Sequence, residues 1–435
     1  MSEPAGAAEG PPGRGLVSEW RPPAAVLAAV LLLAVASYLG LGVVAAWPQV
    51  RALDSDFVNY FNAARALSAG NSPFSVPNFD YPPLLALVVL PLVPLGLEGA
   101  RWAWFILGHA CLLVAAGLLW RKLGADRVAL LAVALVWGVG GTIAENLVLG
   151  QVNPLLLLLV VVSLPPGRGS CGTSFPIGAA TALKLWPGVL VLRDALLGRV
   201  RRSALALLVA AGLDVGPVLA VATLLPPPAT PPHARYWMGT PALYNFSVPA
   251  VVLRILDPPS AGQPLPHAWV VGNDPGQLVL SAAHRAVSVA VALAGLGIGL
   301  AVLFGLVRRR GRTHTDPLLL TGALVALALA WAPVCWYHYR LLNFLGAAAI
   351  CSVAMRRRRW GLFAVALTAL VVVTWVAPVI DHVYIATHGW TAASPVALWC
   401  LTSVAPLADL VLGSLCLFGP GNPRGSHEGP RIDVE

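Results

Sequence analysis

Residues 54–83 read DSDFVNYFNAARALSAGNSPFSVPNFDYPP, and we interpret the rest of the chain as a scaffold around this stretch. It follows an apolar run, residues 23–46, that is long enough to cross a bilayer. Apolar side chains recur in it at i, i+3, i+4, i+7 and i+10, which is the spacing of one helix face: Phe57, Tyr60, Phe61, Ala64 and Leu67. The pattern predicts a short amphipathic helix that lies in the membrane interface, just past the first transmembrane helix.

Three of the chain's few carboxylates lie in the same stretch, Asp54, Asp56 and Asp80. A carboxylate at the membrane interface can remove a proton from a hydroxyl group as a general base. Asp and Ser are also preferred N-caps, so capping alone would explain a single aspartate before a helix. Because two aspartates stand here, one can cap while the other acts as a base, and Asp56 is the first candidate. Asp80 precedes Tyr-Pro-Pro, where a turn and a chemical role are equally consistent.

The composition is that of a membrane protein. Of 435 residues, 58% are hydrophobic and 11% are charged, whereas soluble domains are about 25% charged. Since about 20 apolar residues cross a bilayer, the many apolar runs predict an all-α polytopic protein with about twelve transmembrane helices. Spans beyond the first are predicted near residues 83–97, 100–120, 128–144, 153–165, 175–192, 203–225, 281–307, 316–333, 340–355, 360–379 and 394–418.

The positive charge of the chain orients these spans. Arginines cluster between apolar runs at 199–202, 308–312 and 356–359, and such clusters mark cytoplasmic loops. The net charge of +9 therefore indicates a membrane orientation and not nucleic-acid binding. The expected organisation is a transmembrane domain over 23–418, with outer loops at 47–82 and 226–280 and disordered cytoplasmic termini at 1–22 and 419–435.

Two topologies fit the region between residues 82 and 193. Five crossings close the parity of a twelve-span protein, and we prefer them. They place Arg121, Lys122 and Arg127 outside, however, against the charge rule. Three crossings with two re-entrant segments would remove that conflict.

Polar residues inside apolar runs are costly and are therefore candidates for function. Lys184 extends its ammonium to the interface, pairs with another group, or faces a polar cavity, where it would suit a phosphate. In WAPVCWYHYRLLNF, residues 331–344, an aromatic belt explains the Trp and Tyr residues but not His338 or Arg340, which can contact an anionic head group. Residues 150–153, Gly-Gln-Val-Asn, interrupt the apolar pattern as a turn or as part of a site.

The large outer loop holds aromatic and hydrogen-bonding residues, among them Asn245 and Arg254, which suit either a sugar site or an ordinary wet loop. Motifs for nucleotide-driven transport, zinc proteolysis and serine hydrolysis are absent, and the six cysteines show no metal or disulfide spacing. A transporter or flippase for lipid-linked or anionic substrates remains an alternative to an enzyme, and it would use the same cations. An inverted repeat would favour it, but none is obvious.

Taken in order, these segments resemble glycosyltransferase family 87, the polyprenol-phosphate-sugar-dependent membrane transferases of actinobacteria with the C-type glycosyltransferase fold. The resemblance covers about residues 25–350. The motifs that carry it are Asp56-Phe57 with Tyr60, Ala64 to Leu67 with Gly70, Tyr81-Pro82-Pro83, Gly150 to Asn153, Lys184 with Pro187, Asn245 to Ser247, and Pro333 through Trp336 to His338 and Tyr339. The chain departs from the family pattern at Ala332 and Phe246, which leaves the donor and acceptor open.

The resemblance implies transfer of a sugar at the extracytoplasmic face of the plasma membrane, with Asp56 as the catalytic base. A single base with in-line attack in turn implies inversion of the anomeric centre. It implies a polyprenyl-phosphate donor, with mannose expected and arabinose the alternative, and a glycolipid or lipoglycan acceptor. No cofactor is expected, and the reaction requires no metal, although Asp54 or Asp80 could bind one. The resemblance places contacts to the donor phosphate at His338, Lys184 and Arg254. Supporting roles are expected for Asp54, Asp80, Tyr81, Gln151, Asn153 and Asn245.

Overall fold

The computed structural model describes residues 20–52, 55–77, 79, 81–164, 174–226, 245–256, 282–310, 316–332, 335–386 and 395–418. Within these residues the regular structure is helical, apart from one isolated antiparallel bridge between Asn245 and Trp336. The first half holds α1 (Ala24–Ser37), α2 (Ala46–Ala52), α3 (Asp56–Ser68), α4 (Pro83–Val89), α5 (Gly96–Lys122), α6 (Arg127–Gly138), α7 (Gly141–Val148), α8 (Asn153–Ser163), α9 (Ser174–Leu183), α10 (Val191–Leu196) and α11 (Val200–Leu224). The second half holds α12 (Val248–Leu256), α14 (Ala282–Arg310), α15 (Pro317–Trp331), a 3-10 helix (Tyr337–Leu342), α16 (Asn343–Arg356), α17 (Trp360–Ala386) and α18 (Pro395–Phe418).

Among the described residues, six helical stretches are long and apolar enough to cross a membrane, or seven if α6 and α7, which bend by 57°, form one span. The chain is therefore a multi-pass membrane protein, as predicted. Twelve crossings are not shown. Where the sequence predicts spans near 153–165 and 175–192, α8 and α9 have only 11 and 10 residues, against the roughly 20 that a crossing needs. The predicted span at 83–97 becomes α4 and a 3-10 turn that run on into α5.

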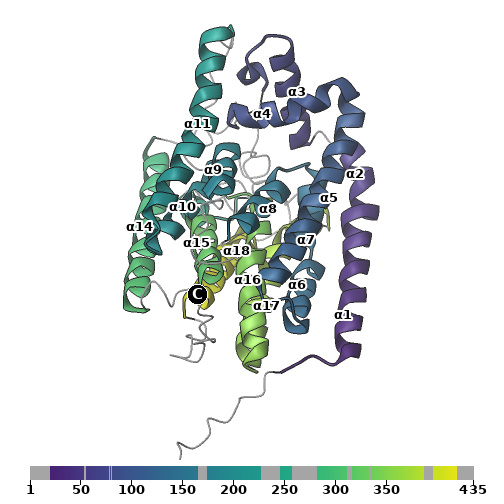
Figure 1. Cartoon of the computed structure of the whole chain (residues 1–435), viewed down its shortest axis with the longest axis vertical. Coiled ribbons are helices and arrows are strands. Elements are labelled where there is room, and N and C mark those ends of the chain that lie inside the picture. Colours follow the sequence, from purple (N-terminus) through teal and green to yellow (C-terminus); the bar gives the residue numbers. More distant parts are fainter. Residues whose placement is uncertain are drawn as a thin grey trace, which may run out of the picture.

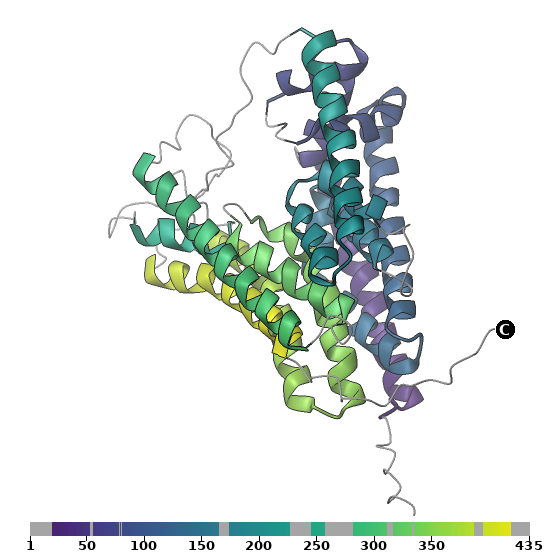
Figure 2. The same cartoon turned by 60° about the vertical axis from the view of Figure 1, so that its left-hand side comes forward.

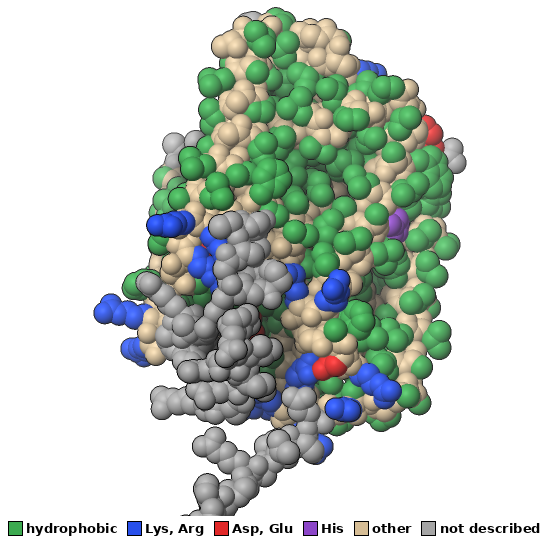
Figure 3. Space-filling model, viewed as in Figure 1, with side chains coloured by type: hydrophobic (Ala, Val, Ile, Leu, Met, Phe, Trp, Pro, Cys, Tyr) green, Lys and Arg blue, Asp and Glu red, His purple; other side chains and the backbone are tan. Residues whose placement is uncertain are grey.

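The turn between α5 and α6 corrects the predicted orientation. Asp126, which caps α6, forms an ion pair with Arg356, and the Arg356 guanidinium also donates to the carbonyl of Leu123 at 2.9 Å. The turn thus lies at the same end of the molecule as the cluster at 356–359. Placing Arg121, Lys122 and Arg127 on the opposite side was wrong, and the charge rule holds for them. In Figure 3 most of the Lys and Arg side chains lie over the lower half of the molecule, and few lie near the top.

The two halves of the chain form two groups of helices. In Figure 1, α3 and α4 lie at the end opposite the start of α1. In Figure 2, the green to yellow helices of the second half lie to one side of the purple to teal helices of the first half. The groups meet where α16 packs against α6, and where the 3-10 helix packs against α7 and α8. The polar residues described below converge at this junction.

The predicted amphipathic helix is present as α3. Ser55 precedes it in an extended conformation, and Gly70 follows it with φ +73°, which lets the amide of Asn71 bond to the carbonyl of Ala66 at 2.9 Å. Its apolar face is buried against α4, the 90–95 turn and α5. Neighbouring helices therefore cover this face, and the position of α3 in the membrane interface stays a prediction. The burial fixes the direction of the first residue, Asp56.

Candidate functional site

A tight turn between α7 and α8 brings the interrupted segment 150–153 against the start of α3. Gly150 has φ +62°, and a Cβ there would lie 2.6 Å from the Cβ of Phe57, so only glycine fits. The amide of Phe57 donates to the carbonyl of Leu149 at 3.2 Å, and the Trp104 indole donates to the Gly150 carbonyl at 2.8 Å. The segment is a turn. Its contacts with Phe57 and Trp104 also place Gln151, the residue after Gly150, beside α3.

Gln151 joins the candidate base to the buried lysine. Its amide nitrogen donates to Oδ2 of Asp56. Its amide oxygen accepts from Nζ of Lys184 at 3.3 Å and from the hydroxyl of Tyr60 at 3.4 Å. Of the two carboxylate oxygens of Asp56, only Oδ2 is hydrogen-bonded to a described residue. The other oxygen, Oδ1, is therefore available to accept a proton. The Ser55 side chain makes no capping bond, and Asp56 bonds to Gln151, so capping does not account for this aspartate.

Lys184 lies among polar and aromatic side chains and does not extend to the interface. It is only 6% exposed, and its Nζ donates to Oδ1 of Asn153 at 3.2 Å as well as to Gln151. The ammonium lies 3.8 Å from the ring centroid of Tyr339 and 5.4 Å from that of Tyr81. Cation–π contact of this kind stabilises a desolvated ammonium by about 2 kcal/mol. These contacts hold the lysine in place without a carboxylate bonded directly to it.

Two asparagines connect this pair to His338. Asn153 donates to Oδ1 of Asn146 at 2.9 Å and to the carbonyl of His338 at 3.2 Å, and Asn146 donates to the same carbonyl at 2.9 Å. The His338 side chain is 7% exposed, and its Nε2 has no hydrogen-bond partner among the described residues. Because buried polar atoms are nearly always bonded, this nitrogen is a candidate for contact with a ligand.

The electrostatics of Asp56 suit a base. Burial raises the pKa of Asp56 above the ordinary value for an aspartate, and the charge of Lys184 and the hydrogen bond from Gln151 oppose that rise without cancelling it. A carboxylate with a raised pKa holds a proton more strongly than an exposed one, which makes it a better proton acceptor near neutral pH. The side chain itself is only half-buried, so a hydroxyl group can approach it.

Arg254 and Asn245 lie beside the same junction and support it through the backbone. The Arg254 guanidinium donates to the carbonyl of Asn245 at 3.1 Å, and Oδ1 of Asn245 accepts from the amide of Cys335 at 2.8 Å. These bonds hold residues 335 and 336 in place just before the 3-10 helix that carries His338. No bond described for Arg254 reaches Asp56, Lys184 or His338, so its predicted contact with a donor phosphate stays a prediction.

Arg340 has a different partner from the predicted anionic head group. Its guanidinium bonds to Oδ2 of Asp409 on α18 at 2.5 Å and to the carbonyl of Phe246 at 2.7 Å, and both charged side chains are fully buried. Asn343 donates to the other oxygen of Asp409 at 2.7 Å. The pair fixes the 3-10 helix to α18, which is a structural role.

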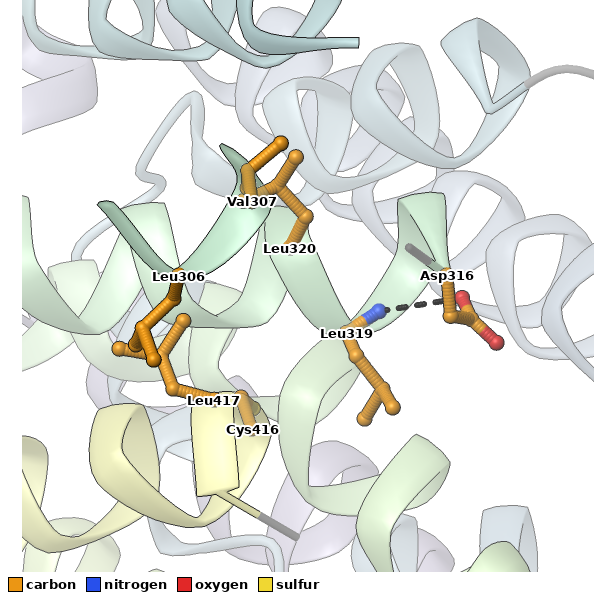
Figure 4. Close-up of a pocket in the computed structure, with 7 residues that line it drawn as sticks. All are labelled: Leu306, Val307, Asp316, Leu319, Leu320, Cys416 and Leu417. Atoms are coloured by element: carbon orange, nitrogen blue, oxygen red, sulfur yellow. Dashed lines mark hydrogen bonds between the residues drawn. The ribbon is translucent and has the colours of Figure 1, made fainter. Parts of the chain in front are cut away.

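Two predicted site residues, Asp54 and Asp80, lie outside the described residues. Within the described part of the chain, no group of three His, Cys, Asp or Glu side chains could hold a metal ion. The hollow drawn in Figure 4 lies elsewhere, between α14, α15 and α18, and measures about 30 Å³. Its lining is mostly aliphatic, and its carboxylate, Asp316, caps α15 through the amides of Leu318 and Leu319. It contains none of the polar residues described above.

Comparison with protein families identifies the chain. The profile of glycosyltransferase family 87 matches residues 79–335, more than half of the length. The chain belongs to glycosyltransferase family 87. No curated protein matches it. The matched residues include Gln151, Asn153 and Lys184, whereas Asp56 lies before them and His338 just after them. Membership implies a membrane glycosyltransferase and favours a transferase over the transporter that the sequence left open.

Three polar residues of this region were not among the predicted site residues: Tyr60 as a hydrogen-bond donor, Asn146 and Asp409. A signal existed for two of them. Asn146 interrupts an apolar pattern seven residues before Asn153, and Asp409 stands in the apolar run 394–418. Isolated polar residues in such runs are candidates for pairing or function. Tyr60 was placed on the apolar face of α3, where its ring is indeed buried.

Proposed function

We propose that this protein transfers a sugar, mannose first among the candidates, from a polyprenyl phosphate to a hydroxyl group of a glycolipid or lipoglycan. The reaction takes place on the extracytoplasmic side of the plasma membrane. The observation that carries the proposal is the hydrogen-bonded chain from Asp56 through Gln151 to Lys184, which sets a base and a cation side by side. An acceptor hydroxyl and a donor phosphate need this pair of groups.

The orientation supports the assigned side. The arginine cluster at 356–359 lies at the same end as the α5–α6 turn and marks the cytoplasm. In Figure 1, α3 and α4 lie at the opposite end. The start of α3, and with it Asp56, then lies toward the extracytoplasmic side, where lipid-linked sugars are used in place of nucleotide sugars.

In the proposed reaction, Oδ1 of Asp56 takes the proton from the acceptor hydroxyl as the hydroxyl oxygen attacks the anomeric carbon. The bond from that carbon to the phosphate oxygen breaks on the opposite face, so the configuration inverts. Lys184 and Nε2 of His338 then stabilise the charge on the departing polyprenyl phosphate. Such preorganised donors act where charge develops, and they act strongly because water is excluded.

The test uses purified protein in detergent with radiolabelled polyprenyl-phosphate mannose and a total lipid extract as acceptor. Removal of a general base typically lowers the rate by about 100-fold to 10,000-fold, so Asp56→Asn should abolish measurable transfer. Asp214→Asn is the matched control, because Asp214 is half-buried on α11 and takes no part in the hydrogen-bond network of the site. The control should retain activity.

The outcomes separate the levels of the proposal. Transfer that continues at the wild-type rate in Asp56→Asn would show that this residue is not the base. Transfer from polyprenyl-phosphate arabinose but not from the mannose donor would keep the reaction and change the sugar. Binding of the lipid donor without transfer to any component of the extract, followed by its movement across proteoliposomes, would support the transporter instead.

A further inference from the structure

A second group of buried charged residues lies where α10 meets α11, apart from the site described above. Arg193 is fully buried and bonds to Oδ2 of Asp194 at 3.1 Å. The guanidinium of Arg199 lies 3.9 Å from the other oxygen of the same carboxylate. One buried carboxylate therefore faces two arginines, and it can neutralise only one of them.

Two further cations act on this pair. Arg202 on α11 is 9% exposed, and its charge, like that of Arg199, acts on Arg193. Lys122 at the end of α5 also lies within electrostatic range of Arg193, and it donates to the carbonyl of Leu164. Within the described residues, four cations thus gather around one carboxylate. We call this group, Lys122, Arg193, Asp194, Arg199 and Arg202, the α10–α11 cluster.

The donors of the cluster are not all used. Nη1 of Arg202, Nη1 of Arg199 and Nε of Arg193 are buried and have no hydrogen-bond partner among the described residues. The other bonds of Arg193 go to Ser163 and Thr321, which are neutral. A buried charge without a counter-charge is strongly destabilising, and a buried donor without an acceptor is rare in native structures. Both facts point to an anion with several acceptor oxygens.

The position of the cluster limits the anion. Lys122 is followed by Leu123, whose carbonyl bonds to Arg356 at 2.9 Å, so the cluster lies at the end of the molecule that the arginines mark as cytoplasmic. Starting at the same point, α11 presents an almost wholly exposed apolar surface, with Val200 at 66% and Leu208 at 69% exposure. An acyl chain would lie on this surface when its head group reaches the arginines.

We propose that the α10–α11 cluster is a phosphate-binding site on the cytoplasmic side, filled by the phosphate of an anionic phospholipid or by soluble phosphate. Planar guanidinium groups bind phosphate oxygens in pairs, and lysine adds a point charge. The site is separate from Asp56 and Lys184, and it needs neither the sugar donor nor the acceptor proposed above. Its ligand holds α5, α10 and α11 together at one end of the molecule.

The test is thermal unfolding of the full-length protein in detergent with three probes: phosphatidylglycerol, phosphatidylcholine and inorganic phosphate. The variant is Arg202→Gln, and the matched control is Arg201→Gln, which makes the same change at the neighbouring, exposed residue. A charge-assisted hydrogen bond lost from a buried site weakens binding by at least about tenfold. The apparent affinity of Arg202→Gln for the stabilising probe should fall by that factor, while the control should match the wild type.

The three probes identify the source of the phosphate. Stabilisation by phosphatidylglycerol alone assigns the site to anionic lipid, and stabilisation by inorganic phosphate alone assigns it to a soluble ion. Equal stabilisation by phosphatidylcholine and phosphatidylglycerol, or by none of the three probes, would overturn the proposal. So would an unchanged affinity in Arg202→Gln. If that variant does not fold, Arg199→Gln, whose side chain is 23% exposed, replaces it, and counting bound phospholipids by native mass spectrometry gives a second readout.

Discussion

Replacing Gln151 by Met tests whether the amide positions the base. Methionine has nearly the same length and volume as glutamine, so the volume filled by the side chain is kept. The variant loses the bond to Oδ2 of Asp56 and the acceptor for Lys184. Lys184 retains its bond to Asn153 at 3.2 Å, which should keep the fold intact.

The size of the effect follows from the bond that is lost. A hydrogen bond to a charged group is worth about 1.5–3 kcal/mol. If the whole bond orients the base in the transition state, kcat/KM falls by about 10-fold to 150-fold. The loss also removes one of the two influences that hold the pKa of Asp56 down. Its pKa then rises further, and because the base must be unprotonated, the acid limb of the pH–rate profile moves to higher pH.

The assay is sugar transfer measured as kcat/KM across the pH range in which both proteins stay folded, with thermal unfolding as a check. Gln49→Met serves as the control, because Gln49 is exposed on α2 and bonds only to the carbonyl of Ala45 within the described structure. The reasoning would be refuted if Gln151→Met and Gln49→Met showed the same kcat/KM and the same acid limb. A lower rate with an unshifted acid limb would retain the positioning role and reject the influence on the base.

Three further changes probe the same junction. Lys184→Met removes the cation that lowers the pKa of the base, so the pH–rate profile should show its acid limb at higher pH and a reduced maximum. Arg340→Met leaves the fully buried carboxylate of Asp409 unpaired and should cost about 3–5 kcal/mol of stability, seen as a lower Tm that adding Asp409→Leu partly restores. Gly150→Ala imposes φ +62° on a residue with a Cβ and should cost about 1–3 kcal/mol. In the same Tm measurement, Gly212→Ala, with nothing within 4 Å of its Cβ, should not destabilise the protein.

Local patterns predicted the parts of the fold that depend on local physics. The periodicity of 54–83 predicted α3, because an apolar face at helical spacing is buried whatever covers it. The helices that bury this face, α4 and α5, could not be predicted, because tertiary packing and not their own composition sets their position. The structure does not show the twelve predicted spans, for a related reason. Apolar helices such as α8 and α9 are buried against other helices, so they can be shorter than a membrane crossing requires.

The candidate site was predicted residue by residue, but its connections were not. Asp56 and Gln151 are 95 positions apart, and Gln151 and Lys184 are 33 apart. Their contact depends on the turn at Gly150 and on the return of α9 toward α3, which no local pattern encodes. The pairing of Arg340 with Asp409 was within reach, however. Two opposite charges in separate apolar runs are each too costly to bury alone, and pairing is the simplest way to bury both.

The position of the Gln151 side-chain amide between Asp56 and Lys184 has a chemical explanation. If Asp56 and Lys184 bonded directly in this buried place, the ion pair would hold the carboxylate proton-free and unreactive, and it would have to break before either group met a substrate. A primary amide both donates and accepts, so Gln151 satisfies the carboxylate and the ammonium at once while keeping them apart. Among the described residues, each charge then retains a side without a hydrogen bond: Oδ1 on Asp56, and the part of the ammonium not bonded to Gln151 or Asn153. A glutamate in this place could not donate to Asp56 without first taking up a proton. In the proposed mechanism, the residue at 151 thus determines whether the pair acts as two separate catalytic groups or as one inert salt bridge.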